Sequence, residues 1–271
     1  MRELLSIAVA AAEAGGAILL ARAGDLGAVR SKSSGFDLVT EADIASGIAV
    51  VRAIAERSEG ARVVVEEPEA LAATGVPEGD IFEGETWVVD PLDGTTSFVH
   101  GYPCYSVSVA CLRDGVPVAG AVRDVPGATT AAAALGLGAT LDGAPIRPAG
   151  SSPLERSLLV TGFPYDRGEP LDRQMAIFSA FIRDVHDVRR DGSAALDCCH
   201  VAAGRCDGYW EGGLKPWDTA AGVVILREAG AVVTDMRGAQ WTPAAGDILA
   251  AGGIALHGLM LDRITRALAR Q

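Results

Sequence analysis

The chain has 271 residues, and its 35 Asp and Glu residues outnumber its 23 Lys and Arg residues, which gives a formal net charge of −12. Hydrophobic residues make up 49% of the sequence, so the composition excludes a disordered or collagen-like chain. The negative charge argues against nucleic acid as a partner, because binding a phosphate backbone needs a basic surface.

The amino-terminal segment is apolar and rich in alanine, as signal peptides are. Glu3 and Glu13 interrupt it, and its apolar residues recur at helical spacing, which favours an amphipathic helix over residues 1–20. No run of about 18 apolar residues without a charge occurs, so we expect no membrane-spanning helix and no membrane partner. The five cysteines lack the spacing of a disulfide scaffold, which predicts a reduced, cytoplasmic setting.

The first half of the chain is predicted to contain one further helix followed by short strands. Thr40 is placed to cap a helix that runs to about Glu59. Apolar runs separated by turn residues then predict strands, and residues 113–115 form a hairpin turn between two of them. The buried stripe of the helix is Ile44, Ile48, Val51 and Ile54 or Ala55; the strands are 62–65, 86–89, 105–112 and 116–122, with two more between Gly136 and Gly143.

After about residue 151 the pattern changes to alternating strands and helices. A strand over 157–161 precedes three helices, and Gly230 is placed to end the last of them. No exposed linker separates the antiparallel-rich half (about 1–150) from the α/β half (151–271), so we predict a single domain of residues 1–271. The three helices are predicted over 171–183, 194–203 and 216–229.

The most informative segment is 86–95, in which an apolar strand leads into the sequence D-P-L-D-G at 90–94. The proline is expected to end the strand, and the glycine permits a sharp turn. Asp90 and Asp93 on such a turn can converge on a divalent cation, with the carbonyl of Leu92 as a further oxygen ligand. The N–H groups that follow begin a short helix and can bind an anion. A metal site beside an anion-binding site indicates a phosphate ligand.

Two other interpretations of this segment remain. It is also compatible with a solvated acidic turn. The D-x-D-G-T motif of aspartyl-phosphate phosphatases, whose first Asp is a nucleophile, has one residue between its acids, whereas two residues separate Asp90 from Asp93. The different geometry favours a metal-activated water over a covalent phosphoenzyme.

Three further acids lie at the ends of predicted elements. Glu66 follows an apolar strand, Asp218 lies in the first turn of a helix, and Asp43 lies near a helix start. Each also has a purely structural explanation, because acids favour helix N-termini and Thr40-x-x-Asp43 fits a capping box.

Together these segments resemble the inositol monophosphatase family of metal-dependent, lithium-sensitive phosphatases. The family signature W-x-x-D-P-[LI]-D-G-T-x-N-F-x-H-G-x-P is matched by residues 87–103, and W-D-x-A-A-G-x-x-[LIV]-x-x-E-A-G-G by residues 217–231. The segments 37–43, 66–67 and 190–196 follow in the family's order, so the likeness covers roughly residues 5–265. The departures from the family pattern are Val65, Ser97 and Ala231, which replace Gly, Asn and Gly; Val65 puts a third metal most in doubt.

The resemblance implies a layered α-β-α-β-α sugar-phosphatase fold and two to three Mg²⁺ ions per active site. One ion would bind Glu66, Asp90 and the carbonyl of Leu92. A second would bind Asp90, Asp93 and Asp218. A third, weaker ion would share Glu66.

The resemblance also implies roles for residues around the metals. Thr95, hydrogen-bonded to Asp43, would orient the attacking water and help to deprotonate it, and Glu66 would be a further catalytic residue. The residues expected at the substrate are Asp93, Gly94 and Thr95 for the phosphate and Gly192, Ser193, Ala194 and Glu211 for the alcohol.

The predicted activity is therefore Mg²⁺-dependent hydrolysis of a small polyol phosphate, first of all myo-inositol 1-phosphate, by a homodimer. The sequence D-G-T-T-S-F at 93–98 favours the inositol branch, since the nucleotide branch has D-G-T-K-E-F. Other substrates kept open are fructose 1,6-bisphosphate, histidinol phosphate and a nucleotide 3′-phosphate. A catalytically silent regulatory or binding member is the alternative of another class.

Two remaining motifs receive structural interpretations. Cys198 and Cys199 precede His200, but adjacent helical residues point about 100° apart, so buried small side chains are favoured over a zinc site. Arg189 and Arg190 either begin a helix in solvent or reach a second phosphate or a ring hydroxyl.

Overall fold

The computed structural model describes residues 1–24, 29–31 and 38–269. Asp37, the first residue of the 37–43 motif, lies outside them. The helices are α1 (Arg2–Arg22), α2 (Glu41–Ala55), α3 (Pro68–Thr74), α4 (Thr95–His100), α5 (Glu169–Phe181), α6 (Ala194–Ala202), α7 (Pro216–Ala229) and α8 (Ile254–Leu268), with a 3-10 turn at Leu154–Arg156. The strands are β1 (Val29–Ser31), β2 (Leu38–Thr40), β3 (Val63–Val65), β4 (Glu85–Asp93), β5 (Ser106–Arg113), β6 (Val116–Asp124), β7 (Thr129–Ala134), β8 (Ala139–Leu141), β9 (Ala144–Pro145), β10 (Leu158–Thr161), β11 (Asp187–Arg189), β12 (Gly208–Gly212), β13 (Val232–Thr234) and β14 (Asp247–Ala251).

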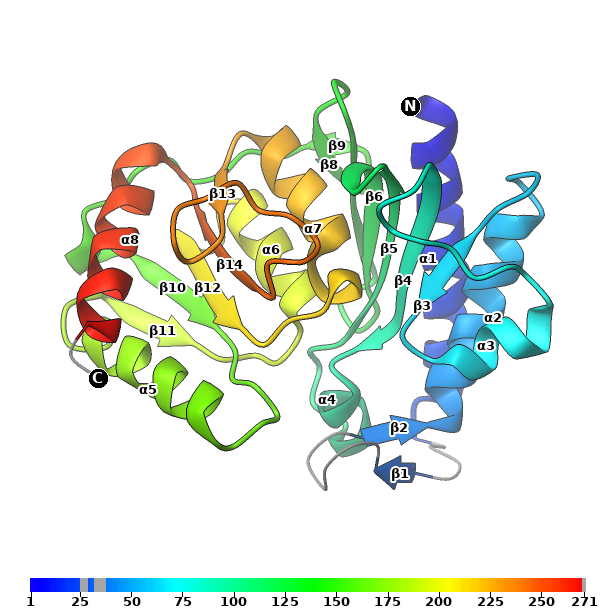
Figure 1. The fold of residues 1–271 in the computed structure, drawn as a ribbon, viewed down its shortest axis with the longest axis horizontal. Coiled ribbons are helices and arrows are strands. Elements are labelled where there is room, and N and C mark those ends of the chain that lie inside the picture. The colour runs from blue at the N-terminus through cyan, green and yellow to red at the C-terminus, as the bar shows by residue number, and fades with distance from the viewer. Residues whose placement is uncertain (25–28, 32–37, 270–271) are drawn as a thin grey trace.

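These elements stack in five layers (Figure 1). Helices α1 and α2 cover one face of a seven-stranded sheet of order β3-β4-β5-β6-β7-β8-β9, and α6 and α7 pack on its other face. A five-stranded sheet of order β11-β10-β12-β14-β13 follows, and α5 and α8 cover its far side. The α-β-α-β-α fold is confirmed, and a hydrophobic cluster that includes Val88 and Tyr209 joins the two halves.

Helix α1 matches the predicted first helix. By length and composition it could cross a membrane. Its buried face packs instead on α2 and on strands β5 to β7, which is the packing of a core helix. The buried residues of α1 are Leu4, Ile7, Ala8, Ala11, Ala12, Gly15, Gly16 and Leu19.

Helix α2 begins at the predicted cap. The side chain of Thr40 accepts hydrogen bonds from the N–H groups of Ala42 and Asp43, and Asp43 completes the capping box. The helix ends at Ala55, before the predicted Glu59, because the next N–H groups bond back to Ile54 in a turn. Of the predicted stripe, Val51 and Ile54 are buried, Ile44 and Ile48 are half-buried, and Ala55 is exposed.

The seven-stranded sheet departs from the prediction at three places. Pro91 lies within β4 and does not end it, because a register shift between Asp90 and Asp93 removes the proline from the ladder, where its missing N–H would cost a hydrogen bond. Only β8 lies between Gly136 and Gly143, and its partner β9 comes just after. Strand β7 was not predicted, because its sequence T-T-A-A-A-A has little intrinsic preference for a strand.

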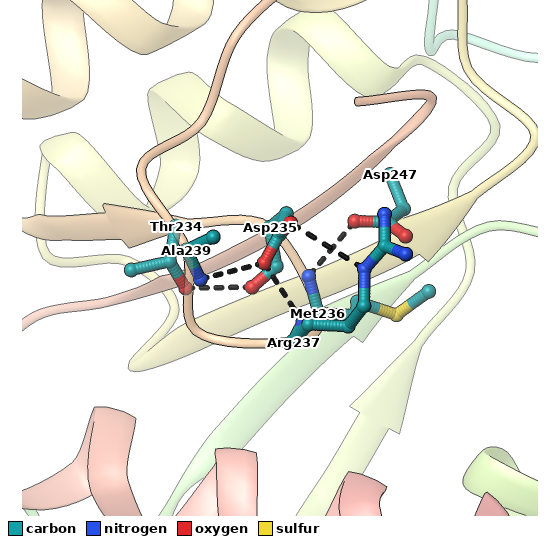
Figure 2. A network of polar contacts seen from close by, with 6 residues as sticks. All are labelled: Thr234, Asp235, Met236, Arg237, Ala239 and Asp247. Carbon is teal, nitrogen blue, oxygen red and sulfur yellow. Dashed lines mark hydrogen bonds and ion pairs between the residues drawn. The ribbon is translucent and has the colours of Figure 1, made fainter. Parts of the chain in front are cut away.

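The α/β half follows the predicted alternation, with α7 at the predicted residues and Gly230 ending it at φ 98°. Beyond β13 the chain turns around the buried Asp235, whose Oδ1 accepts the N–H groups of Arg237 (2.9 Å) and Ala239 (2.8 Å) (Figure 2). Asp247 accepts the N–H of Met236 at 2.8 Å beside this turn. Some acids of this acidic chain therefore hold loops together.

Candidate active site

A pocket of about 300 Å³ is lined by residues of both sheets and of the helices between them, and it gathers most of the predicted site residues. The first sheet contributes the end of β4 and the start of α4, and the second contributes β12 and the loop after β10. The predicted residues that line the pocket are Glu66, Asp90, Leu92, Asp93, Gly94, Thr95, Gly192, Ala194, Glu211 and Asp218. Asp43 and Ser193 lie behind this lining and contact it through hydrogen bonds.

The bulge in β4 brings Asp90 and Asp93 into the pocket wall. Asp90 Oδ1 accepts the N–H of Leu92 at 3.0 Å. Asp93 Oδ2 accepts the hydroxyl of Ser193 at 2.6 Å and the N–H of Ala195 at 2.8 Å, which ties the first sheet to the start of α6. Ser193 thus contacts Asp93 and does not itself line the pocket.

Asp218 comes from the first turn of α7. Its Oδ2 accepts the N–H of Lys215 at 2.7 Å, which is the helix-capping contact expected of an acid at this position. Among the described residues, the hydrogen bonds of Asp90, Asp93 and Asp218 engage a single oxygen of each carboxylate. A capping role and a role in the pocket are therefore compatible in one residue.

Gly94 makes the tight turn from β4 into α4. It has φ 93°, and a Cβ there would lie 2.8 Å from the carbonyl oxygen of Cys104, so a side chain fits neither the backbone conformation nor the space. Gly94 and Thr95 line the pocket at the helix start, where N–H groups lack partners within the helix. This arrangement suits an anion.

Thr95 and Asp43 form the predicted pair. The hydroxyl of Thr95 lies 3.1 Å from Asp43 Oδ1 and 3.1 Å from the carbonyl oxygen of Leu92. The other oxygen of Asp43 accepts the N–H of Thr40 at 2.8 Å within the capping box. Burial raises the pKa of the Asp43 carboxyl, opposed by these hydrogen bonds. One carboxylate therefore caps α2 and holds Thr95.

The acids of the pocket repel one another. Loss of solvent, followed by repulsion from Glu66, Asp93 and Asp218, raises the pKa of Asp90 well above its ordinary value. Desolvation likewise raises the pKa of Asp93 to about 6, and desolvation with repulsion from Asp93 raises that of Asp218. A divalent cation would relieve this cost, and carboxylate and carbonyl oxygens are the ligands that Mg²⁺ prefers.

The chemical types of these donors therefore fit a hard divalent cation. Among the described residues, no three His, Cys, Asp or Glu side chains are already arranged to hold a metal ion.

The second sheet supplies Glu211, which the hydroxyl of Tyr209 contacts at 2.8 Å. Desolvation raises the pKa of Glu211 to about 7, partly offset by the Tyr209 hydrogen bond. Arg190 also lines the pocket, whereas Arg189 pairs with Asp187 at 2.5 Å outside it. Of the two arginines, the structure therefore assigns only Arg190 to the pocket.

The lining residues that the sequence prediction missed come mainly from two segments, the loop that follows β10 and the connection from β12 into α7. Their main sequence signal is their place at or just after the end of a strand, where loops of α/β folds commonly carry function, and Trp217 also begins the second family signature. All five cysteines are buried, which was predicted for Cys198 and Cys199. The missed lining residues are Leu38, Gly162, Phe163, Pro164, Tyr165, Gly212, Gly213, Leu214, Lys215 and Trp217.

Comparison with known proteins places this site in a family. The model of the inositol monophosphatase family matches residues 1–269. Inositol-1-monophosphatase of Synechocystis sp. is 40% identical over 249 residues, which cover 92% of this chain and 84% of that protein. Nus factor SuhB of Pasteurella multocida is 38% identical over 254 residues, which cover 93% and 92% of the two chains.

Solved structures agree with the sequence comparison. The inositol monophosphatase from Anabaena has a TM-score of 0.84 at 39% identity, over 97% of this chain and 95% of that one. SuhB from Mycobacterium tuberculosis has a TM-score of 0.80 at 35% identity, over 97% and 96%. The chain therefore belongs to the inositol monophosphatase family and is a phosphatase.

Proposed function

We propose that the protein hydrolyses a small polyol phosphate monoester, first of all myo-inositol 1-phosphate, in a Mg²⁺-dependent reaction. The supporting observation is that one pocket brings these residues together. The acids of β4 and α7 and the start of α4 line it, and the second sheet contributes Glu211. The relative named inositol-1-monophosphatase supports the choice of substrate.

The proposed metal ligands are those implied by the family resemblance. Glu66, Asp90 and the carbonyl of Leu92 would hold one ion, and Asp90, Asp93 and Asp218 would hold a second, with Glu66 shared by a weaker third. Bound Mg²⁺ would neutralise the phosphate and lower the pKa of the attacking water. The same ions would offset the repulsion that raises the pKa values of Asp90 and Asp218.

Thr95 would orient the attacking water and pass its proton toward Asp43. The hydroxyl hydrogen of Thr95 is directed at Asp43 Oδ1 or at the carbonyl of Leu92, which leaves a lone pair of Oγ1 to accept from water. The raised pKa of Asp43 makes this carboxylate a better proton acceptor than an exposed aspartate. The N–H groups of Gly94 and Thr95 would bind phosphate oxygens.

The alcohol part of the substrate would lie toward the second sheet. Glu211 offers a carboxylate to hydroxyl groups, and Gly192, Ala194 and Arg190 line the same side of the pocket. Ser193 would act through Asp93, to which it is hydrogen-bonded.

Release of inorganic phosphate from a panel of esters tests this function. The panel contains myo-inositol 1-phosphate, fructose 1,6-bisphosphate, histidinol phosphate and a nucleotide 3′-phosphate, each with Mg²⁺, with EDTA and with added lithium. We expect the inositol ester to be the best substrate, with activity lost in EDTA and inhibited by lithium. A better rate on another ester would correct the substrate and leave the phosphatase class in place.

A second candidate function is binding to a partner protein, because some relatives are named Nus factors. The presence of all the proposed ligands in one pocket favours catalysis. Absence of turnover on every ester of the panel would instead favour the binding role. We further propose a cytoplasmic homodimer, and light scattering on the purified protein tests whether it is a dimer.

A further inference from the structure

The carboxylate of Glu211 is held by a residue that does not itself line the pocket. Tyr209 and Glu211 lie two residues apart on β12, so their side chains are on the same face of the sheet. The hydroxyl of Tyr209 donates to Glu211 Oε2 at 2.8 Å. Tyr209 is fully buried, and its strand pairs with β10 and β14 on either side. The donor is therefore fixed in place.

Gly162 bounds the other side of this carboxylate. A Cβ on Gly162 would lie 2.0 Å from Glu211 Oε1, so the carboxylate packs directly on the glycine backbone. The amide of the buried Gln174, on α5, donates to the carbonyl of Gly162 at 2.7 Å and to the hydroxyl of Thr161 at 2.8 Å. That hydroxyl donates to the carbonyl of Trp210 at 2.6 Å, which ties the loop back to β12.

We propose that Tyr209 is a positioning residue that holds the Glu211 carboxylate against the backbone of Gly162, where Glu211 recognises hydroxyl groups of the substrate alcohol. The inference rests on the proposed function, in which that alcohol faces Glu211. A carboxylate fixed on one oxygen by Tyr209 keeps its other lone pairs oriented for a ring hydroxyl. An ester whose leaving group has no hydroxyl gains nothing from this contact.

The first test compares kcat/KM for myo-inositol 1-phosphate with kcat/KM for p-nitrophenyl phosphate, whose leaving group has no free hydroxyl before cleavage. In Tyr209→Phe we expect this ratio to fall about tenfold, the scale of one hydrogen bond to a charged group. The loss should come mainly from KM of the inositol ester. Tyr105→Phe is the matched control, because the described residues show no hydrogen bond to the Tyr105 hydroxyl, and it should leave the ratio unchanged.

A double-mutant cycle separates positioning from a general packing defect. If Tyr209 acts through Glu211, the variant Tyr209→Phe/Glu211→Ala, in which no carboxylate remains to be held, has the same ratio as Glu211→Ala alone. Multiplied losses in the double variant would overturn the inference. Gly162→Ala pushes on the carboxylate from the opposite side and should lower the ratio in the same way.

A crystal structure of Tyr209→Phe tests the positioning role without a measurement of activity. We expect the Glu211 carboxylate to move away from the backbone of Gly162 in this variant. A carboxylate that stays in place, with an unchanged ratio, would overturn the positioning role. If the wild-type protein cleaves neither ester, the proposed function fails, and the position of Glu211 in the variant still tests the inference.

Discussion

The two sheets hold their pocket carboxylates in different ways. On the side of the first sheet, Asp90 and Asp93 sit on one bulged strand and are held mainly by nearby N–H groups and by Ser193, while they repel each other. On the side of the second sheet, Glu211 is held by the hydroxyl of Tyr209 and packs on the backbone of Gly162. The first arrangement concentrates negative charge, which supports the proposed cation site, whereas the second fixes one carboxylate, which supports its proposed role in recognition.

Asp93→Asn should have the largest effect, because it removes charge where the first sheet concentrates it. We expect kcat/KM to fall on the order of a thousandfold for every ester, the scale of losing a principal electrostatic group. Phosphate release measures this loss, and Asp114→Asn, in the hairpin turn outside the pocket, serves as control. Full activity of Asp93→Asn would contradict the assigned role of the first sheet.

Thr95→Ala should come next, because it removes the hydroxyl that Asp43 holds. We expect kcat to fall about a hundredfold with little change in KM, the scale of losing a general acid–base contact. Thr95→Ser keeps the hydroxyl and should retain most of the activity. Equal losses in the two variants would show that the methyl group, not the hydroxyl, matters on this side.

Mg²⁺ should stabilise the fold, because it relieves the repulsion among the acids of the first sheet and α7. At a hundred times its dissociation constant, a ligand raises the free energy of unfolding by about 2.7 kcal/mol. Thermal unfolding in millimolar Mg²⁺ and in EDTA measures the shift, which Asp218→Asn should reduce and Glu211→Gln should preserve. Equal melting temperatures in the two buffers would contradict the assignment of a metal site.

The smallest expected effect is the pH dependence that Glu211 contributes. The pKa of Glu211 is raised in the folded protein from 4.5 to about 7, so its contribution to stability is fully present below pH 4.5 and is lost as the pH rises through 7. Glu211→Gln removes this titration. We therefore expect the variant to gain on the order of 2 kcal/mol relative to wild type between pH 5 and pH 8 in EDTA. Denaturant unfolding at both pH values measures the gain, and a constant difference would refute the burial of a charged Glu211.

Local features of the fold were predictable because neighbouring residues determine them. Thr40 and Asp43 cap α2, and Gly230 ends α7, as their residue types and spacing indicated. Strand β7 and the continuation of β4 through Pro91 were not predictable. Neighbouring strands stabilise an alanine-rich segment, and a bulge accommodates a proline only within an assembled sheet.

The same division applies to the pocket. The sequence alone determined the resemblance to a phosphatase family and, through it, which acids belong to one site. It could do so because the motifs around Asp90 and Asp218 have the residue spacing of the family signatures. Only the tertiary structure decided that Arg190 rather than Arg189 enters the pocket, that Ser193 contacts Asp93, and that the loop after β10 closes on Glu211. These contacts join segments up to about a hundred residues apart, and their geometry depends on how the two sheets pack around α6 and α7.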